Sequence, residues 1–316
     1  MDITKPVVPI DRWQQKHRFI SFAYGVIKKY GEDNAGYMAA LLTYYGFLSL
    51  FPLLLVVVTV LHIWFHNDPT VQNEVSTSVG HFFPLLGSQL QTQIHGLRGA
   101  GVGLIIGIVI TMYGARGAAD AFRYALDSMW QVPKNKRVGF PRNIVRSVAI
   151  MIAAAGAFVA TVAASTFTAA LGHASWVKVI ANISGFITLT LVLGYMYRIA
   201  TGGRIRYRYM LLGAVIAAAS VQLLLSFGSI VLAHQLNHLD AIYGTFAVVL
   251  GLLFWIYLMA QIVLFAAEID VVRHFSLYPR SLSGKLQTEA DRHAYKLYAQ
   301  TEKYIEKEHI RVRFHR

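Results

Sequence analysis

Four charged side chains of alternating sign form the sharpest charge pattern in the sequence. They are, in order, Arg116, Asp120, Arg123 and Asp127. Their separations of four, three and four residues place them along one face of a helix, where opposite charges can pair. Pairing lowers the cost of holding ionised groups in an apolar environment, and ionised groups held there often carry function. Two interpretations follow: a gate or headgroup site, or an intrahelical salt-bridge ladder on a helix that projects into the cytosol.

A second pair of ionisable side chains, Glu268 and Asp270, lies at the end of a long apolar run. At such a boundary the two carboxylates can gate a path or couple it to protons, with Arg273 or the arginines of the first group as partners. Alternatively, they anchor two helices through a salt bridge that water can reach.

Three uncharged residues within apolar runs are also candidates for a substrate path. Pro52 removes one helical hydrogen bond and frees the carbonyl of Leu48, which predicts a kink. A kinked helix can line a substrate site, or it can be a packing bend whose backbone Ser49 satisfies. Gln222 and Gln261 are expected to face other helices and to form hydrogen bonds between them.

Two histidine pairs have the spacing of metal ligands. The two residues of each pair, His62 with His66 and His234 with His238, are four positions apart. On a helix, both imidazoles of a pair would lie on one face, where they could bind one metal ion or sense pH. The sequence contains no cysteine, Walker A loop, complete G-x-G-x-x-G, H-E-x-x-H or G-x-S-x-G. We therefore expect no enzyme, no catalytic residue, no metal and no cofactor.

Segments that could hold these groups in a membrane recur six times along the chain. With 55% hydrophobic and 14% charged residues, the composition is too apolar for an ordinary soluble surface. A bilayer core about 30 Å thick needs roughly 20 apolar residues in a helix, and continuous apolar runs favour helices over barrel strands. The sequence predicts an all-α polytopic membrane protein with six transmembrane helices. Their expected bounds are 37–64, 99–118, 145–171, 176–197, 210–233 and 243–267.

The basic residues predict the orientation of these helices. Twenty-five Lys and Arg residues precede the first span, separate the second from the third and the fourth from the fifth, or follow the sixth. The opposite segments carry only Arg98 and Lys178. Because Lys and Arg accumulate on the cytoplasmic side, both termini are expected in the cytosol. The net charge of +13 then reflects orientation and contact with anionic headgroups, and no nucleic-acid partner is expected.

The chain divides into three segments. Residues 1–36 are a cytosolic and interfacial N-terminal segment, in which Trp13 to Tyr30 has the pattern of one amphipathic helix lying on the membrane. Residues 37–270 are the six-helix transmembrane domain. Residues 271–316 are a cytosolic tail of helix-forming composition, expected to be partly helical and frayed. No segment outside the membrane reaches the length of a typical catalytic domain.

Several blocks of the sequence resemble the bacterial YihY/BrkB membrane family, once catalogued as ribonuclease BN. They are ALLTYYGFLSLFP at 40–52, AFRYALDSMW at 121–130, RYMLLGA at 208–214 and YGTFAVVLGLLFWIY at 243–257. The resemblance implies a six-helix inner-membrane protein linked to envelope integrity and, for some members, to serum resistance or export of lipid A precursors. It implies no catalytic residues, and no metal-binding cluster that could hydrolyse RNA is visible in the cytosolic segments.

These observations favour a lipid or envelope-precursor transporter or flippase in the bacterial inner membrane. The alternative is a non-transporting scaffold or regulator of envelope assembly, which recruits partners through its tail or interfacial helix. A third hypothesis, an ion channel or proton-coupled exporter of small solutes, lacks a selectivity-filter sequence. The expected partners are membrane lipids and either a second copy of the chain or envelope-assembly proteins.

Overall fold

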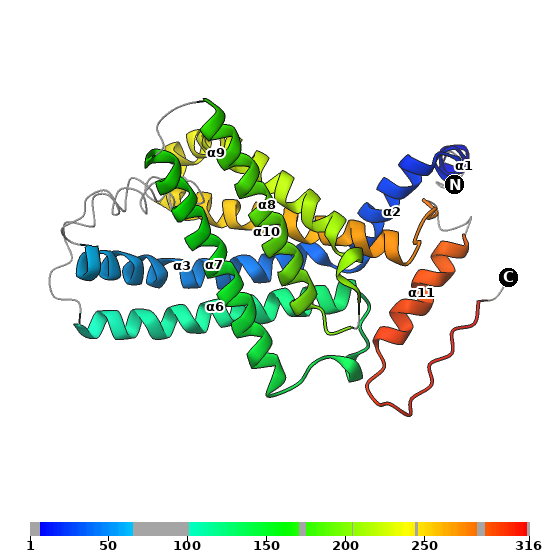
Figure 1. Ribbon diagram of the computed structural model, residues 1–316. Helices are drawn as coiled ribbons and strands as arrows, with labels where there is room; N and C mark the ends of the chain where they lie inside the picture. The colour runs from blue at the N-terminus through cyan, green and yellow to red at the C-terminus, as the bar shows by residue number, and fades with distance from the viewer. Residues whose placement is uncertain are drawn as a thin grey trace.

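The structure is a bundle of long helices with a smaller helical layer at one end (Figure 1). The computed structural model describes residues 7–65, 101–170, 175–203, 205–243, 246–282 and 288–314. It describes the backbone alone for 7, 51–65, 101–104, 158–170, 175–178, 181 and 229–243. Every regular element in these ranges is a helix, which confirms the predicted all-α class for this part of the chain.

Six long helices make up the bundle. They are α3 (Ala35–Phe65), α6 (Gly101–Met129), α7 (Arg142–Ala170), α8 (Ser175–Ala200), α9 (Leu211–Tyr243) and α10 (Phe246–His274). The described residues contain four stretches that are long and apolar enough to cross a membrane: Ile105–Met129, Asn182–Ala200, Leu211–Gly228 and Phe246–His274. These stretches make the chain a multi-pass membrane protein by length and composition.

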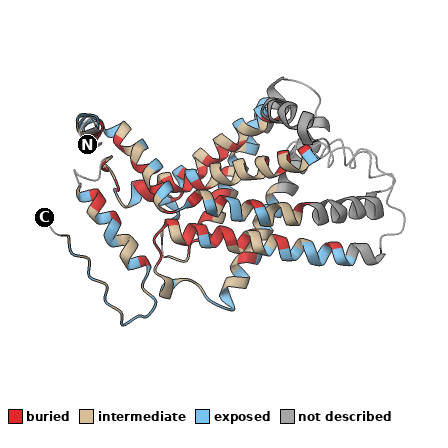
Figure 2. Cartoon of the chain, turned by 180° about the vertical axis from the view of Figure 1, so that it is seen from behind, coloured by how far each residue is buried: buried red, intermediate tan, exposed pale blue. Residues whose placement is uncertain are grey.

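The outer surface of the bundle is apolar, as contact with lipid requires. Exposed side chains on its helices include Ile106, Ile152, Leu191 and Leu223. Buried residues instead follow the sides on which the helices meet (Figure 2). Because lipid is as apolar as leucine, packing between such helices depends on close fit rather than on hydrophobic burial, and Ala214, Ala217 and Ala218 of α9 are fully buried in that contact.

The smaller layer lies at the end of the bundle where both termini are found, which we call the basal end (Figure 1). It consists of α1 (Val7–Lys16), α2 (Arg18–Glu32) and α11 (Glu289–Thr301). The sequence predicted one helix from Trp13 to Tyr30, and this was wrong. Residue His17 is extended, with φ −98° and ψ 103°, and it divides the segment into two helices. Two 3₁₀ turns, η1 (Lys134–Lys136) and η2 (Tyr207–Tyr209), link long helices.

The C-terminal tail is partly helical, as its composition predicted, and its helix α11 packs against the rest of the chain. A capping box begins α11: the Thr288 hydroxyl accepts the backbone amide of Asp291 at 3.1 Å, and the Asp291 carboxylate accepts that of Thr288. Ala294 of α11 is buried with Val26 of α2 and Val272 of α10. The tail therefore joins the N-terminal helices to the end of the last long helix.

Candidate functional site

Among the described helices, α3 and α6 form the most extensive contact. A Cβ added to Gly114 would lie 2.8 Å from the Cβ of Ser49, and one added to Gly117 would overlap the ring of Tyr45. Glycine at both positions therefore lets the two helices approach, as small residues do in membrane bundles. The helices run side by side over most of their length (Figure 1).

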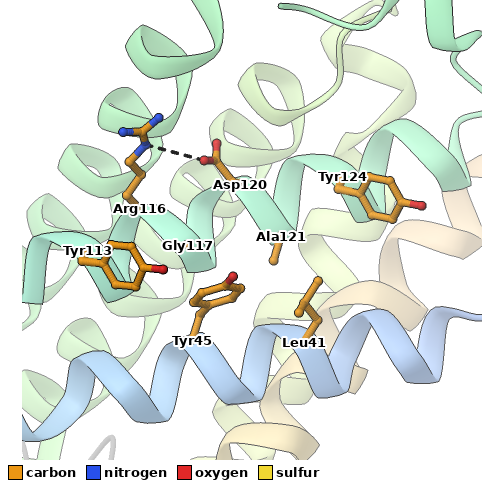
Figure 3. A pocket seen from close by; sticks show the side chains of 8 residues that line it. All are labelled: Leu41, Tyr45, Tyr113, Arg116, Gly117, Asp120, Ala121 and Tyr124. Carbon is orange, nitrogen blue, oxygen red and sulfur yellow. Dashed lines mark ion pairs between the residues drawn. The ribbon is translucent and has the colours of Figure 1, made fainter. Parts of the chain in front are cut away.

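Beside this contact the surface is hollowed into a groove of about 410 Å³, which we call the lateral groove (Figure 3). The rings of Tyr113 and Tyr124 lie at its rim and are mostly exposed, and Tyr45 lies on its floor over Gly117. The remaining residues that line it are Leu41, Arg116, Asp120 and Ala121. It is therefore an aromatic groove with one cation and one anion, open on the outer surface of α3 and α6.

The predicted ladder of charges exists in part. Arg116 Nε lies 3.7 Å from Asp120 Oδ2, and Arg123 Nη1 donates to Asp120 Oδ1 at 3.1 Å. Arg123 also reaches across to α7, donating to the carbonyl of Asn143 at 3.1 Å and to Ser147 Oγ at 3.3 Å. The Arg123 side chain is 8% exposed, whereas that of Arg116 is 53% exposed. Arg123 is thus a structural cation, and Arg116 faces the groove.

Asp127 does not continue the ladder. Its Oδ1 accepts the backbone amide of Gly202 at 2.5 Å, so it ties the end of α6 to the residue after α8. The predicted pairing of Asp127 with Arg123 was therefore wrong. This contact with a backbone amide gives Asp127 a structural role that needs no bound ligand.

A second hollow of about 470 Å³, the basal cavity, lies where α3, α6 and α11 meet. It shares Leu41 and Tyr124 with the lateral groove, so the two hollows adjoin. Its polar lining comes from the link between α2 and α3, from the end of α6 and from the tail, and consists of Glu32, Asp33, Asn34, Ser128, Gln131, Lys134, Arg137, Tyr298, Thr301 and Glu302.

A buried charge cluster of Lys29, Asp33 and Glu268 lies behind this cavity. Lys29 Nζ forms an ion pair with Asp33 and lies 3.4 Å from Glu268 Oε1, and the Lys29 and Glu268 side chains are fully buried. Gln131 Nε2 donates to the other oxygen of Asp33 at 3.1 Å. Burial raises the pKa of Asp33 to about 6, against the opposing effect of the Lys29 ammonium. Two carboxylates thus share one ammonium inside the protein.

The partners predicted for Glu268 and Asp270 were wrong, and so was their access to water. Glu268 pairs with Lys29 of α2 rather than with Arg273 or the arginines of α6. Asp270 Oδ2 accepts the backbone amide of Gly213 at 2.8 Å, which ties α10 to the start of α9. Both residues are buried. They hold helices together, as one of the two sequence interpretations had it, but through a buried lysine and a backbone amide.

The remaining candidates have smaller roles. Gln222 Nε2 of α9 donates to the carbonyl of Asn182 in α8 at 3.3 Å, which confirms its predicted contact between helices. Gln261 is half-buried in α10, with no side-chain hydrogen bond to any residue described. The backbone of helix α3 continues through Pro52 as one element, and the kink predicted there stays a prediction.

The four histidines with metal-ligand spacing also lie outside the described side chains. His66 falls in the segment 66–100, and His62, His234 and His238 have only their backbone described. Across the residues that are described, no group of three or more His, Asp or Glu side chains is close enough to hold a metal ion.

A second buried charge network, the tail clasp, closes the basal end. The Arg280 guanidinium is fully buried and donates to both oxygens of Glu32 at 2.8 Å and to Asp291 at 2.7 Å. Lys28 Nζ lies 3.1 Å from Asp291. Burial opposes ionisation of Asp291, but Arg280, the amides of Thr288 and Ser281, and Lys28 together lower its pKa to about 2.

Sequence reasoning missed Lys29, Asp33, Arg280 and the groove tyrosines. Lys28 and Lys29 read as one basic pair on a membrane-surface helix, yet Lys28 is partly exposed and Lys29 is fully buried. The signal that could have distinguished them is the apolar spacing of Val26 and Tyr30 on the same helix face as Lys29. Arg280 gives no such signal, because both its partners lie far away in the sequence or in the tail.

These features define the protein as an all-α, multi-pass membrane protein, with an aromatic groove beside a charged helix face. The chain belongs to the Virulence factor BrkB family, whose match covers residues 26–289. This confirms the resemblance read from the sequence blocks. The protein is accordingly a multi-pass protein of the bacterial inner membrane.

Two of the relatives have membrane-protein names, and a third has a ribonuclease-like name. A UPF0761 membrane protein of Pseudoalteromonas atlantica is 27% identical over 82% of this chain and 88% of its own length. One from Chlorobium luteolum is 25% identical over 86% of this chain and 64% of its own length. The putative ribonuclease-like protein YfkH of Bacillus subtilis is 24% identical over 81% of this chain and 96% of its own length. No solved structure matches the chain significantly.

Proposed function

We propose that this protein moves lipids or lipid-linked envelope precursors across the bacterial inner membrane. One observation carries the proposal: the lateral groove opens on the outer surface of α3 and α6 and adjoins the basal cavity at Leu41 and Tyr124. A lipid headgroup could travel along such polar and aromatic linings while its acyl chains stay in the bilayer. Polar groups in membrane-spanning helices commonly mark the paths of substrates.

The proposal places six spans in the membrane, with both termini in the cytosol. Its support is the length of the helices: α3, α6, α7, α8, α9 and α10 have 26 to 33 residues. At about 1.5 Å per residue, each exceeds a bilayer core of about 30 Å. The excess of Lys and Arg in the segments that would face the cytosol supports the orientation. The basal cavity then opens to the cytosol.

Reconstituted proteoliposomes test the proposal directly. Protein-dependent movement of a fluorescent phospholipid between leaflets is the expected result, and Asp120→Ala should slow it by disturbing the charged wall of the groove. Leu41→Trp should also slow it, because the larger ring fills the junction of the two hollows. Leu191→Trp is the matched control, since Leu191 is an exposed residue of α8 that lines neither hollow. Equal rates with and without protein, for several phospholipids and a lipid A precursor, would refute the proposal.

A non-transporting scaffold of envelope assembly is the competing function. The observation that favours it is the ordered tail, which is clasped to α2 and leaves Tyr304 and Ile305 exposed beyond α11. Exposed apolar side chains at a polar end of a protein can dock a partner. Deletion of residues 302–316, which leaves α11 intact, should then abolish envelope function in cells, while the full-length protein moves no lipid in proteoliposomes.

A further inference from the structure

Arg116 is a half-exposed charged side chain without a strong partner. Its closest acceptor, Asp120 Oδ2, is 3.7 Å away, which is beyond hydrogen-bond distance. Its guanidinium makes no hydrogen bond to any other residue that the structure describes. Arg116 lies within the apolar stretch Ile105–Met129, two residues before the expected cytosolic end of the second span at 118. A half-exposed guanidinium near the cytosolic end of a span can meet the anionic headgroups of that leaflet.

Asp120 is already engaged by other groups. Its Oδ1 accepts hydrogen bonds from Ser147 Oγ at 2.5 Å and from Arg123 Nη1 at 3.1 Å. The buried Arg123 therefore neutralises Asp120, and Arg116 is the surplus positive charge of the three side chains. An anion that enters the groove finds one uncompensated cation at half exposure.

The groove has the shape and lining for a small anionic group attached to lipid. Its volume of about 410 Å³ lies in the range of ordinary ligand sites. Arg116 lines the groove from α6, where its guanidinium extends beside Asp120 and away from Tyr45 and Leu41 of α3 (Figure 3). Exposed tyrosine rings of this kind hold headgroups at membrane interfaces, because one end of the ring is apolar and the other is polar.

We propose that Arg116 binds the phosphate of a membrane-lipid headgroup seated in the lateral groove. A planar guanidinium donates two parallel hydrogen bonds to phosphate, which a point charge cannot do. The ligand is a lipid rather than a free anion, because the groove opens where the outer surface of α3 and α6 is apolar. This inference rests on the proposed function, for which it names the chemical group that the groove recognises.

Binding measured without transport tests the inference. Full-length protein in a neutral detergent is titrated with phosphatidylglycerol, and bound lipid is counted by native mass spectrometry. Diacylglycerol with the same acyl chains lacks the phosphate and should bind far less. Arg116→Gln should weaken phosphatidylglycerol binding about tenfold, the effect of losing one charge-assisted hydrogen bond. Arg116→Lys should recover only part of the loss.

Arg142→Gln is the matched control, because it removes an exposed arginine from the beginning of α7 without touching the groove. An equal loss of binding in both Gln variants would mean general charge attraction and overturn the inference. Displacement of the lipid by millimolar inorganic phosphate would assign the site to a soluble anion, which also overturns it. Specific binding without lipid movement would leave the inference standing and refute the proposed function. If Arg116→Gln changes neither lipid binding nor lipid movement, the inference is refuted and the proposed function stands.

Discussion

At the scale of single residues, the most consequential group is the buried charge cluster. Lys29 is the only ammonium between Asp33 and Glu268 among the contacts described, and its Nζ also donates to the carbonyl of Met129 at 3.3 Å. Removing one member of a buried ionic group leaves an uncompensated charge, which costs far more than the group contributes as a whole. A substitution of one member of the cluster should therefore destabilise the protein far more than a pair of substitutions that removes both opposite charges.

Lys29→Met should destabilise the protein strongly, by about 3–5 kcal/mol, because two carboxylates would remain buried without an ammonium. Lys29→Met with Glu268→Gln should recover much of that loss. Thermal unfolding in detergent and the yield of monodisperse protein measure both effects. The exposed Lys16→Met should change stability by no more than about 0.5 kcal/mol. Similar unfolding temperatures for Lys29→Met and Lys16→Met would contradict the cluster's role.

Asp33 makes the stability depend on pH. Its folded pKa of about 6 lies above that of an unfolded aspartate, near 3.9. The folded state thus binds the proton more tightly, and the stability this contributes is complete below about pH 4 and is lost as the pH rises through 6. The unfolding temperature of the native protein should fall over that interval, and Asp33→Asn should flatten the profile. Parallel profiles for the two proteins would contradict the assignment.

At the scale of elements, the contacts between helices depend on glycines. A Cβ at Gly213 would lie 2.5 Å from the carbonyl oxygen of Ala266 and from Asp270 Oδ2, so α9 and α10 touch through their backbones. Gly185 of α8 has no neighbouring atom within 4 Å of the same position. The two glycines therefore form a matched pair.

Gly213→Ala should separate α9 from α10 and cost about 1–3 kcal/mol, the usual effect of overpacking. Gly185→Ala should be neutral or stabilising by about 0.5–1 kcal/mol, since glycine is unfavourable within a helix. Unfolding temperatures in one detergent compare the two. A loss of stability of the same size in both variants would contradict the prediction, because the α9–α10 contact would then accommodate a methyl group as well as an open site does.

The tail clasp is a second device at this scale. Its central carboxylate, Asp291, has a pKa of about 2, well below the unfolded value, so its stabilisation is present above about pH 4 and is lost as the pH falls towards 2. Asp291→Asn should release α11 at neutral pH, because Arg280 would stay buried with Glu32 alone. Hydrogen exchange of residues 288–301 should rise sharply. Glu289→Gln, an exposed neighbour in the first turn, should leave the exchange unchanged.

The sequence predicted the long helices well and the contacts between them poorly. Continuous apolar runs placed α3 and α8 to within three residues at each end, because the bilayer fixes their length, whereas α10 ends seven residues beyond its predicted end. The spacing from Arg116 to Arg123 correctly implied pairing with Asp120, since neighbours one turn apart meet on any helix. Lys29 and Glu268 are 239 positions apart, and no local pattern specifies such a pair. The sequence could not predict the lateral groove for the same reason, because the groove exists only where α3 and α6 meet.

At the scale of the whole molecule, orientation is the property to establish. The sequence contains no cysteine, so single cysteines can be introduced without a background. Cysteines in place of the exposed Lys136 and Glu306 should react with an impermeant reagent only after the inner membrane is opened, because both would face the cytosol. A cysteine at Asn73, between the first two proposed spans, should react in intact spheroplasts. Reaction of Glu306→Cys in intact spheroplasts would refute the proposed orientation.

The tail clasp also bears on how the chain is made. Glu32 receives its hydrogen bonds from Arg280, 248 residues later, and Lys29 meets Glu268 only slightly earlier in synthesis. During translation, the helix before the first long span must therefore wait, with its charges solvated, until the last span has been inserted. Closure of the basal end requires that every intervening helix has reached its place. A fragment that ends before residue 268 would leave Lys29 without Glu268 and Glu32 without Arg280, so its basal end could not close.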